Sequence, residues 1–268
     1  MKQAFGLVLY LAYFFVHVFG QYETSSTGAI PSGRIVNGST IVSIANYRFV
    51  VALRQDGFAY CGASVISTKH ALTAAHCFDQ KPPIDSLTVY GGSTNQYTGG
   101  VIFNVSEVII HPEYKSTGIN YDAALVKIEG SFAGHRFISP IKLQDQEITL
   151  SPQKTSWCYI VGWGYTNGDR EDNPEMLQQM WMLLLSQYSC AKQWGEELLT
   201  PEMICTQLPN VDICSGDSGG PLVCGGKLTG IVSWGTSDCT GDWPAVFAKV
   251  ASTSIRDFVK KHTAKLIN

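Results

Sequence analysis

Short β-prone runs separated by glycine-rich turns dominate the chain from residue 35 onward. Representative runs are S-V-I at 64–66, A-L-V-K-I at 124–128 and G-I-V-S-W at 230–234. The turn signals between such runs are Gly91-Gly92, Gly99-Gly100, Asn167-Gly168 and Gly225-Gly226. Many short strands joined by such turns predict an all-β barrel or sandwich.

Two stretches depart from this pattern. Near the C-terminus, behind the candidate N-cap Ser254, helical spacing relates Ile255, Phe258, Val259 and His262. This spacing predicts one closing amphipathic helix. Between residues 135 and 155 prolines interrupt the strand pattern, and we expect two tightly joined β units to meet there.

The N-terminus carries processing signals. Residues 1–20 combine a basic start, a short apolar run and a small final residue, which predicts a signal peptide. An uncleaved membrane anchor is the alternative, although a run this short is marginal for crossing a bilayer. Residues 21–34 are polar and turn-rich and end at Arg34, before I-V-N-G. We interpret them as an activation propeptide, which leaves 35–268 as the folded domain.

Composition narrows the function classes. Of the 268 residues, 45% are hydrophobic and 15% charged, and the net charge is −3. These values disfavour disorder, and they make nucleic acid or an acidic membrane an unsuitable main partner. The eight cysteines stand at 61, 77, 158, 190, 205, 214, 224 and 239. An even number behind a signal peptide predicts four disulfides and an extracellular location, with the pairing left open. A metal site is the less favoured alternative, because no C-x-x-C pair is present and the adjacent His76 and Cys77 have poor geometry for metal ligands; we expect no cofactor.

The strongest chemical signal is G-D-S-G-G-P at 216–221. Flanking glycines let the backbone turn sharply around Ser218 and approach a reacting carbonyl. A serine hydroxyl becomes a good nucleophile only when a base takes its proton. His76 in T-A-A-H-C and Asp122 in N-Y-D-A-A-L are the candidate base and orienting acid. Each alone has a structural alternative, namely a solvated histidine and a turn aspartate.

Together these motifs resemble the chymotrypsin/trypsin family of serine proteases over essentially all of 35–268. The matching segments are I-V-N-G at 35–38, T-A-A-H-C at 73–77, D-A-A-L at 122–125, G-W-G at 162–164, G-D-S-G-G-P at 216–221 and S-W-G at 233–235. The order His, Asp, Ser is also that of the family. The resemblance implies two antiparallel six-stranded β-barrels with the active site between them, plus a C-terminal α-helix.

The resemblance also implies residue roles. Ser218 would attack the scissile carbonyl, His76 would carry the proton, and Asp122 would hold the imidazole. The backbone N–H groups of Gly216 and Ser218 would form the oxyanion hole. Substrate would lie along the cleft wall formed by Ser233, Trp234 and Gly235. The implied disulfides are Cys61–Cys77, Cys158–Cys224, Cys190–Cys205 and Cys214–Cys239.

Activation follows the same resemblance. Cleavage after Arg34 would free the α-amine of Ile35, which would then pair with Asp217 and order the oxyanion hole. A carboxylate held in a tight turn beside the nucleophile needs such a partner on physical grounds alone. The uncleaved chain would be a zymogen.

Specificity depends on Asp212, which stands where trypsin-like members carry the acid at the base of the pocket. It predicts cleavage after Arg or Lys. Two departures from the family add bulk to the pocket, Ile213 beside Asp212 and Ala245 at the usual position of a glycine. Chymotrypsin-like or elastase-like specificity is the alternative. A further alternative is an inactive homologue that acts as a binding module.

Remaining features concern partners and modification. Protein and peptide substrates and protein protease inhibitors are the expected partners of a secreted monomer, which has no membrane contact once the signal peptide is removed. Asn37 and Asn104 begin glycosylation sequons. No Asp or Glu lies between Asp85 and Glu107, the stretch matching the family's calcium loop, so we expect no calcium requirement.

Overall fold

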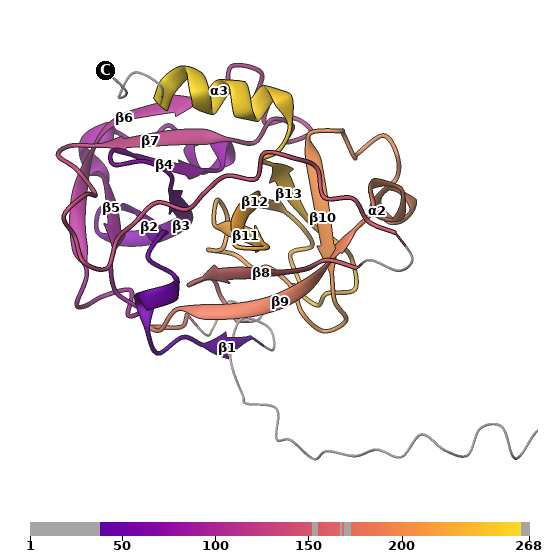
Figure 1. Cartoon of the computed structure of the whole chain (residues 1–268), viewed down its shortest axis with the longest axis horizontal. Coiled ribbons are helices and arrows are strands. Elements are labelled where there is room, and N and C mark those ends of the chain that lie inside the picture. The colour runs from indigo at the N-terminus through magenta and orange to yellow at the C-terminus, as the bar shows by residue number, and fades with distance from the viewer. Residues whose placement is uncertain (1–37, 152–154, 167, 169–172, 264–268) are drawn as a thin grey trace, which may run out of the picture. The chain divides into compact units, whose positions relative to one another are not determined.

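The computed structural model describes residues 38–151, 155–166, 168 and 173–263. The predicted signal peptide and propeptide, with Arg34 and Ile35, lie outside this part of the chain. The fold is all-β and contains two closed six-stranded antiparallel barrels, drawn from indigo to magenta and from salmon to yellow in Figure 1. Among the described helices, none is long and apolar enough to cross a membrane.

The first barrel closes in the order β2-β3-β4-β7-β6-β5. Its strands are β2 (Val50–Gln55), β3 (Phe58–Val65), β4 (His70–Thr73), β5 (Leu87–Gly91), β6 (Val101–Ile110) and β7 (Ala124–Ile128). Alternate residues point inward and meet in a core that includes Val51, Leu53, Val89, Phe103 and Val126. The short 3-10 helices η2 (Ala75–Phe78) and η3 (Ile84–Ser86) lie in its connections, and η1 (Ile44–Asn46) precedes it.

The second barrel follows a connection whose described residues, 129–151 and 155–156, belong to none of the named strands. It consists of β8 (Trp157–Gly162), β9 (Gln178–Leu185), β10 (Met203–Gln207), β11 (Pro221–Cys224), β12 (Lys227–Trp234) and β13 (Ala245–Lys249). Pairing of β9 with both β8 and β10 closes this barrel. The two-residue strand β1 (Ser39–Thr40) joins β9 at its edge. Four disulfides join Cys61 to Cys77, Cys158 to Cys224, Cys190 to Cys205 and Cys214 to Cys239, the same pairs that the resemblance implies.

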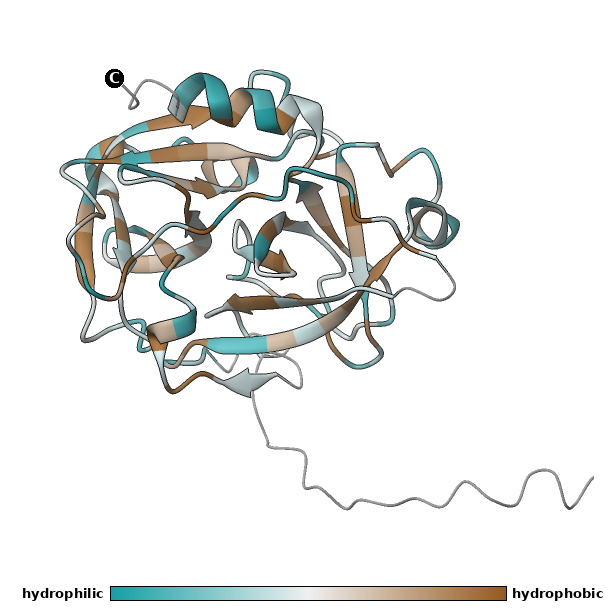
Figure 2. Ribbon diagram, viewed as in Figure 1, coloured by the Kyte–Doolittle hydropathy of each residue, from teal (hydrophilic) through white to brown (hydrophobic). Residues whose placement is uncertain are grey.

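Two apolar clusters bind the barrels to each other. In one, Val50 of the first barrel packs with Val161 and Val223 of the second. In the other, Leu72 and Ile231 meet beneath the buried side of helix α3 (Thr253–Thr263). Figure 2 shows hydrophobic and hydrophilic residues alternating along α3, as expected for an amphipathic helix.

Helix α3 begins slightly earlier than its sequence signal suggests. Ser254, the candidate N-cap, lies inside the helix, and its hydroxyl contacts His111 Nε2 at 3.1 Å and Glu113 Oε2 at 2.9 Å. The hydroxyl of Ser252 accepts from the N–H of Ile255 at 3.4 Å and takes the capping position. A second helix, α2 (Gln187–Trp194), was not predicted.

A buried arginine organises the loop that matches the calcium loop of the family. Arg54 is only 7% exposed, and its guanidinium donates to the carbonyl of Gln96. It also lies 3.8 Å from the centre of the Tyr90 ring, a cation–π contact. The interior of this loop therefore holds a cation supplied by the chain itself.

Candidate active site

The candidate base His76 lies on η2, directly after β4. The Cys61–Cys77 disulfide fixes the neighbouring backbone to β3. Ligand atoms of Cys61, His76 and Cys77 come within 4.8 Å of one another, a spacing that could suit a metal. Because the two sulfurs are bonded to each other, neither offers the thiolate that a metal needs.

Asp122 precedes β7 and is almost fully buried, with 1% exposure. It accepts hydrogen bonds from the His76 backbone N–H at 2.9 Å, and its Oδ2 lies 2.7 Å from His76 Nδ1. A third bond comes from the Ser233 hydroxyl at 2.6 Å. Three partners satisfy a carboxylate that would otherwise be costly to bury. The imidazole is thereby held at Nδ1, which leaves Nε2 for chemistry.

Two opposing effects act on the pKa of His76. Burial lowers this pKa, but the hydrogen bond to Asp122 and the negative charges of Asp122 and Asp79 together raise it by a larger amount. The net result is a pKa above the ordinary value of 6.5. A base of this kind holds an acquired proton more firmly, which suits a group that must carry a proton between two steps.

Ser218 lies on a tight turn that packs against the segment leading to His76. Gly216 and Gly219, on either side, have φ of +94° and +75°, which favour glycine. The Ser218 carbonyl accepts from the Gly62 N–H at 2.7 Å, and the Thr73 hydroxyl donates to the Gly62 carbonyl at 2.7 Å. Among the described residues no hydrogen bond joins Ser218 to His76, and a free active site often shows this contact loosened.

The backbone of this turn presents two unused donors. Asp217 N–H bonds to Cys214 O at 3.0 Å, and Gly219 N–H bonds to Val232 O at 2.8 Å. The N–H of Gly216, just before Asp217, and the N–H of Ser218, just after it, donate to no group in the described structure. Paired free donors beside a serine hydroxyl are the requirement for stabilising an oxyanion.

Asp217 is buried beneath the turn, with 1% exposure. Within the described part of the chain its carboxylate accepts from two backbone donors, Gly164 N–H at 3.0 Å and Cys214 N–H at 3.1 Å. Burial raises its pKa to about 7 because these bonds compensate the charge only in part. A side chain at Gly162 or Gly164 would collide with this carboxylate, which explains the glycines of the G-W-G segment.

Asp212, which the resemblance places at the base of the substrate pocket, is buried with 1% exposure. Its carboxylate accepts from its neighbour Ile213 N–H at 2.8 Å and from Gly241 N–H at 3.3 Å. Burial, reinforced by the charge of Asp238, raises its pKa to about 6. The acid therefore lacks a cationic partner in the described structure.

Both departures from the family, Ile213 and Ala245, are buried in the second barrel. Ile213 comes so near Gly235 that a methyl group added there would meet Ile213 Cδ1 at 3.5 Å. Ala245 is fully buried on β13, in the same apolar cluster as Ile213.

Two supporting contacts had no sequence signal. Ser233 was expected only as a cleft-wall residue, yet its hydroxyl bonds to Asp122, and the register of β12 against β13 shifts between Val232 and Trp234, on either side of it. Trp234 packs edge-to-face on Trp194 of α2, with ring centres 4.9 Å apart. The unpredicted helix thus packs against a residue that the resemblance assigns to the cleft wall.

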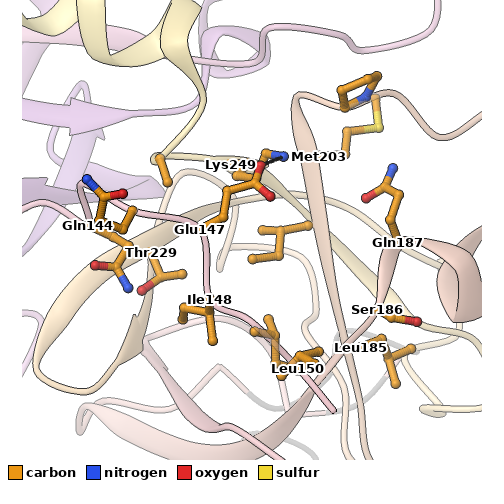
Figure 3. A pocket seen from close by; sticks show the side chains of 15 residues that line it. Gln144, Glu147, Ile148, Leu150, Leu185, Ser186, Gln187, Met203, Thr229 and Lys249 are labelled. Atoms are coloured by element: carbon orange, nitrogen blue, oxygen red, sulfur yellow. Dashed lines mark hydrogen bonds and ion pairs between the residues drawn. The ribbon is translucent and has the colours of Figure 1, made fainter.

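A separate hollow of about 420 Å³ lies on the second barrel (Figure 3). Ile148 and Leu150 of the inter-barrel connection line it, and Glu147 and Lys249 form an ion pair of 2.6 Å at its edge. None of the candidate catalytic residues lines it.

Comparison with known proteins agrees with this architecture. A family model described as Trypsin matches residues 35–259. Trypsin alpha of Drosophila erecta is 35% identical over 233 residues, covering 85% of this chain and 88% of that protein. Trypsin delta of Drosophila melanogaster is 34% identical over 234 residues, covering 85% and 90%. The chain belongs to the trypsin family of serine proteases.

Proposed function

We propose that the chain is a secreted serine endopeptidase, made as a zymogen and activated by cleavage between Arg34 and Ile35. One observation carries the proposal. A buried Asp122 holds the His76 ring at 2.7 Å beside the turn that presents Ser218. A histidine so held, next to a serine on a glycine-flanked turn with two free N–H donors, is equipped for acyl transfer.

The proposed reaction has two halves. Ser218 Oγ attacks the peptide carbonyl carbon while His76 Nε2 takes the hydroxyl proton, and the carbonyl oxygen becomes an oxyanion held by the N–H groups of Gly216 and Ser218. The C–N bond then breaks, and the amine leaves with the proton from His76. Water repeats the sequence on the acyl-enzyme and restores Ser218.

Activation would supply the charge that Asp217 lacks. A raised pKa of about 7 means that the carboxylate is poorly stabilised by its two backbone donors. The new α-amine of Ile35 would pair with it and fix the adjoining turn. Residues 1–20 would act as the signal peptide and 21–34 as the propeptide, both removed before the enzyme works.

We propose cleavage after Arg and Lys. Asp212 is buried without a cation, so an apolar substrate group would leave its charge uncompensated, whereas a basic side chain would pair with it. Ile213 and Ala245 would lower the efficiency without reversing the preference. Protein inhibitors that present an extended loop would bind the same cleft of the monomer.

Covalent labelling tests the catalytic proposal. The precursor is cut at Arg34–Ile35, then treated with a fluorophosphonate and assayed on a peptide amide. We expect labelling at Ser218 and loss of more than about 10⁴-fold of the activity in Ser218→Ala. Ser215→Ala, a change in the same loop, is the matched control and should keep both the labelling and the peptidase activity. Absence of labelling in the cut wild-type protein would instead favour the inactive binding module.

A further inference from the structure

The sequon Asn104-Val105-Ser106 lies on β6, on the outer surface of the first barrel. Asn104 and Ser106 are exposed, whereas Val105 between them is 4% exposed and packs in the barrel core. Alternation along the strand therefore directs the acceptor amide and the required hydroxyl toward solvent together. A sugar attached here would displace no core residue.

The surface beside Asn104 is concave and mixed in character. A hollow of about 540 Å³ is lined by Ile84, Leu87 and Val105, with Asp85, Ser106 and Glu129 adding polar groups. Ile84 is 40% exposed. The Asn104 amide itself donates to Glu129 Oε2 at 3.2 Å, so its nitrogen lies at the border of this hollow. Such a surface suits a sugar ring, which has an apolar C–H face and a polar rim.

We propose that Asn104 carries an N-linked oligosaccharide whose first N-acetylglucosamine lies against this hollow. The inference rests on the proposed secretion, because the donor, a lipid diphosphate-linked oligosaccharide, is met only in the secretory pathway. Asn104 Nδ2 forms a bond to the sugar C1 and loses a proton, while the C1–oxygen bond to the lipid diphosphate breaks.

The position leaves the candidate cleft open. Asn104 contacts Glu129, directly after β7, whereas Asp122 lies before the start of the same strand. The five residues of β7 lie between them and span about 15 Å. The glycan should therefore add bulk and solubility without affecting peptide cleavage. The second sequon, at Asn37, lies outside the described residues and close to the proposed new N-terminus.

The experiment expresses the full precursor in a eukaryotic secreting cell and treats the protein from the medium with peptide N-glycosidase F. We expect a downward mobility shift, with Asn104 converted to aspartate in the tryptic peptide. Asn104→Gln and Ser106→Ala should abolish the shift. Ser106→Thr should keep it, and so should Asn37→Gln. Since Ser106 Oγ also donates to Lys127 O at 3.1 Å, the threonine variant separates loss of the sequon from loss of that bond.

The outcomes separate this proposal from the proposed function. Secreted wild-type protein that shows no shift, or a shift that persists in Asn104→Gln, overturns the glycan while leaving fluorophosphonate labelling as the measure of catalysis. A glycosylated protein that takes no label overturns the catalytic proposal alone. Protein that remains in the cytosol without sugar overturns both secretion and the glycan.

Discussion

The two barrels differ in the hydrogen-bond partners that surround their buried aspartates. Asp122, from the first barrel, receives three hydrogen bonds, two of them from a histidine that can carry positive charge. Asp212 and Asp217, from the second, are equally buried but have only backbone donors among the partners described, and their pKa values rise to about 6 and about 7. The first barrel thus contributes an acid whose hydrogen bonds are satisfied, whereas the second holds two acids with no cationic partner among the described residues. In the proposed enzyme, activation supplies one cation and substrate supplies the other.

The largest expected effect comes from substituting Asp122, the acid whose hydrogen bonds are satisfied. Asp122→Asn should lower kcat by about 10⁴-fold, the loss typical of triads whose acid is neutralised, because the imidazole takes the wrong tautomer. Ser233→Ala removes one bond to the same carboxylate and should cost at most about tenfold. Steady-state kinetics on a peptide amide measure both. Equal losses in the two variants would contradict the central role of the His76 contact.

The next largest effect is expected at Asp217, the proposed partner of the new N-terminal amine. In the cut protein, Asp217→Asn should lower kcat/KM by about 10²- to 10³-fold, since breaking a buried ion pair costs about 3–5 kcal/mol. In the uncut precursor the same substitution should change little. N-terminal sequencing confirms that cleavage produced Ile35. A cut variant with full activity would refute the pairing.

A smaller effect is expected at the pocket. Ala245→Gly should raise activity on Arg and Lys substrates about tenfold, because removing a crowding methyl relieves about 1–3 kcal/mol. Asp212→Ser, the companion variant, should remove the basic preference. A library of substrates varied at the residue before the cleaved bond measures both. Preference of the wild-type enzyme for Phe, Tyr or Leu would replace this specificity with a chymotrypsin-like one.

Acidity should affect the stability of the precursor modestly. The pKa of Asp217 rises from 3.8 in the free side chain to about 7 in the folded chain, so the folded state binds its proton more tightly. This contribution to stability is fully present below about pH 4 and is lost as the pH rises through 7. The melting temperature of the precursor should therefore fall between pH 5 and pH 8 by more than that of Asp217→Asn. Identical slopes would show that Asp217 is already paired.

The smallest effect is expected from chelation. Arg54 already places a cation inside the loop, which carries no carboxylate between Asp85 and Glu107. EDTA should leave the melting temperature unchanged in calorimetry, whereas Arg54→Met should lower it. A marked drop on chelation in the wild-type protein would identify a metal site elsewhere.

Sequence patterns predicted the features that depend on local chemistry. The run at 124–128 coincides with β7, and that at 230–234 lies within β12. Features set by tertiary contact were missed. Strand β1 has only two residues and depends on β9, and the bond from Ser233 to Asp122 joins residues far apart in the chain. Helix α2 buries only Cys190, so it has little amphipathic pattern, although its cap Ser186 was a usable signal.

The Asp122 carboxylate joins side chains from both halves of the molecule, His76 from one barrel and Ser233 from the other. Its geometry therefore depends on correct docking of two units that are far apart in the chain. A nascent polypeptide with only the first barrel folded would contain the histidine and the acid but no nucleophile, and one with misdocked barrels would lose the alignment. In the proposed enzyme, peptide cleavage would therefore become available only once both barrels are folded and docked, and unfinished copies would leave neighbouring proteins intact.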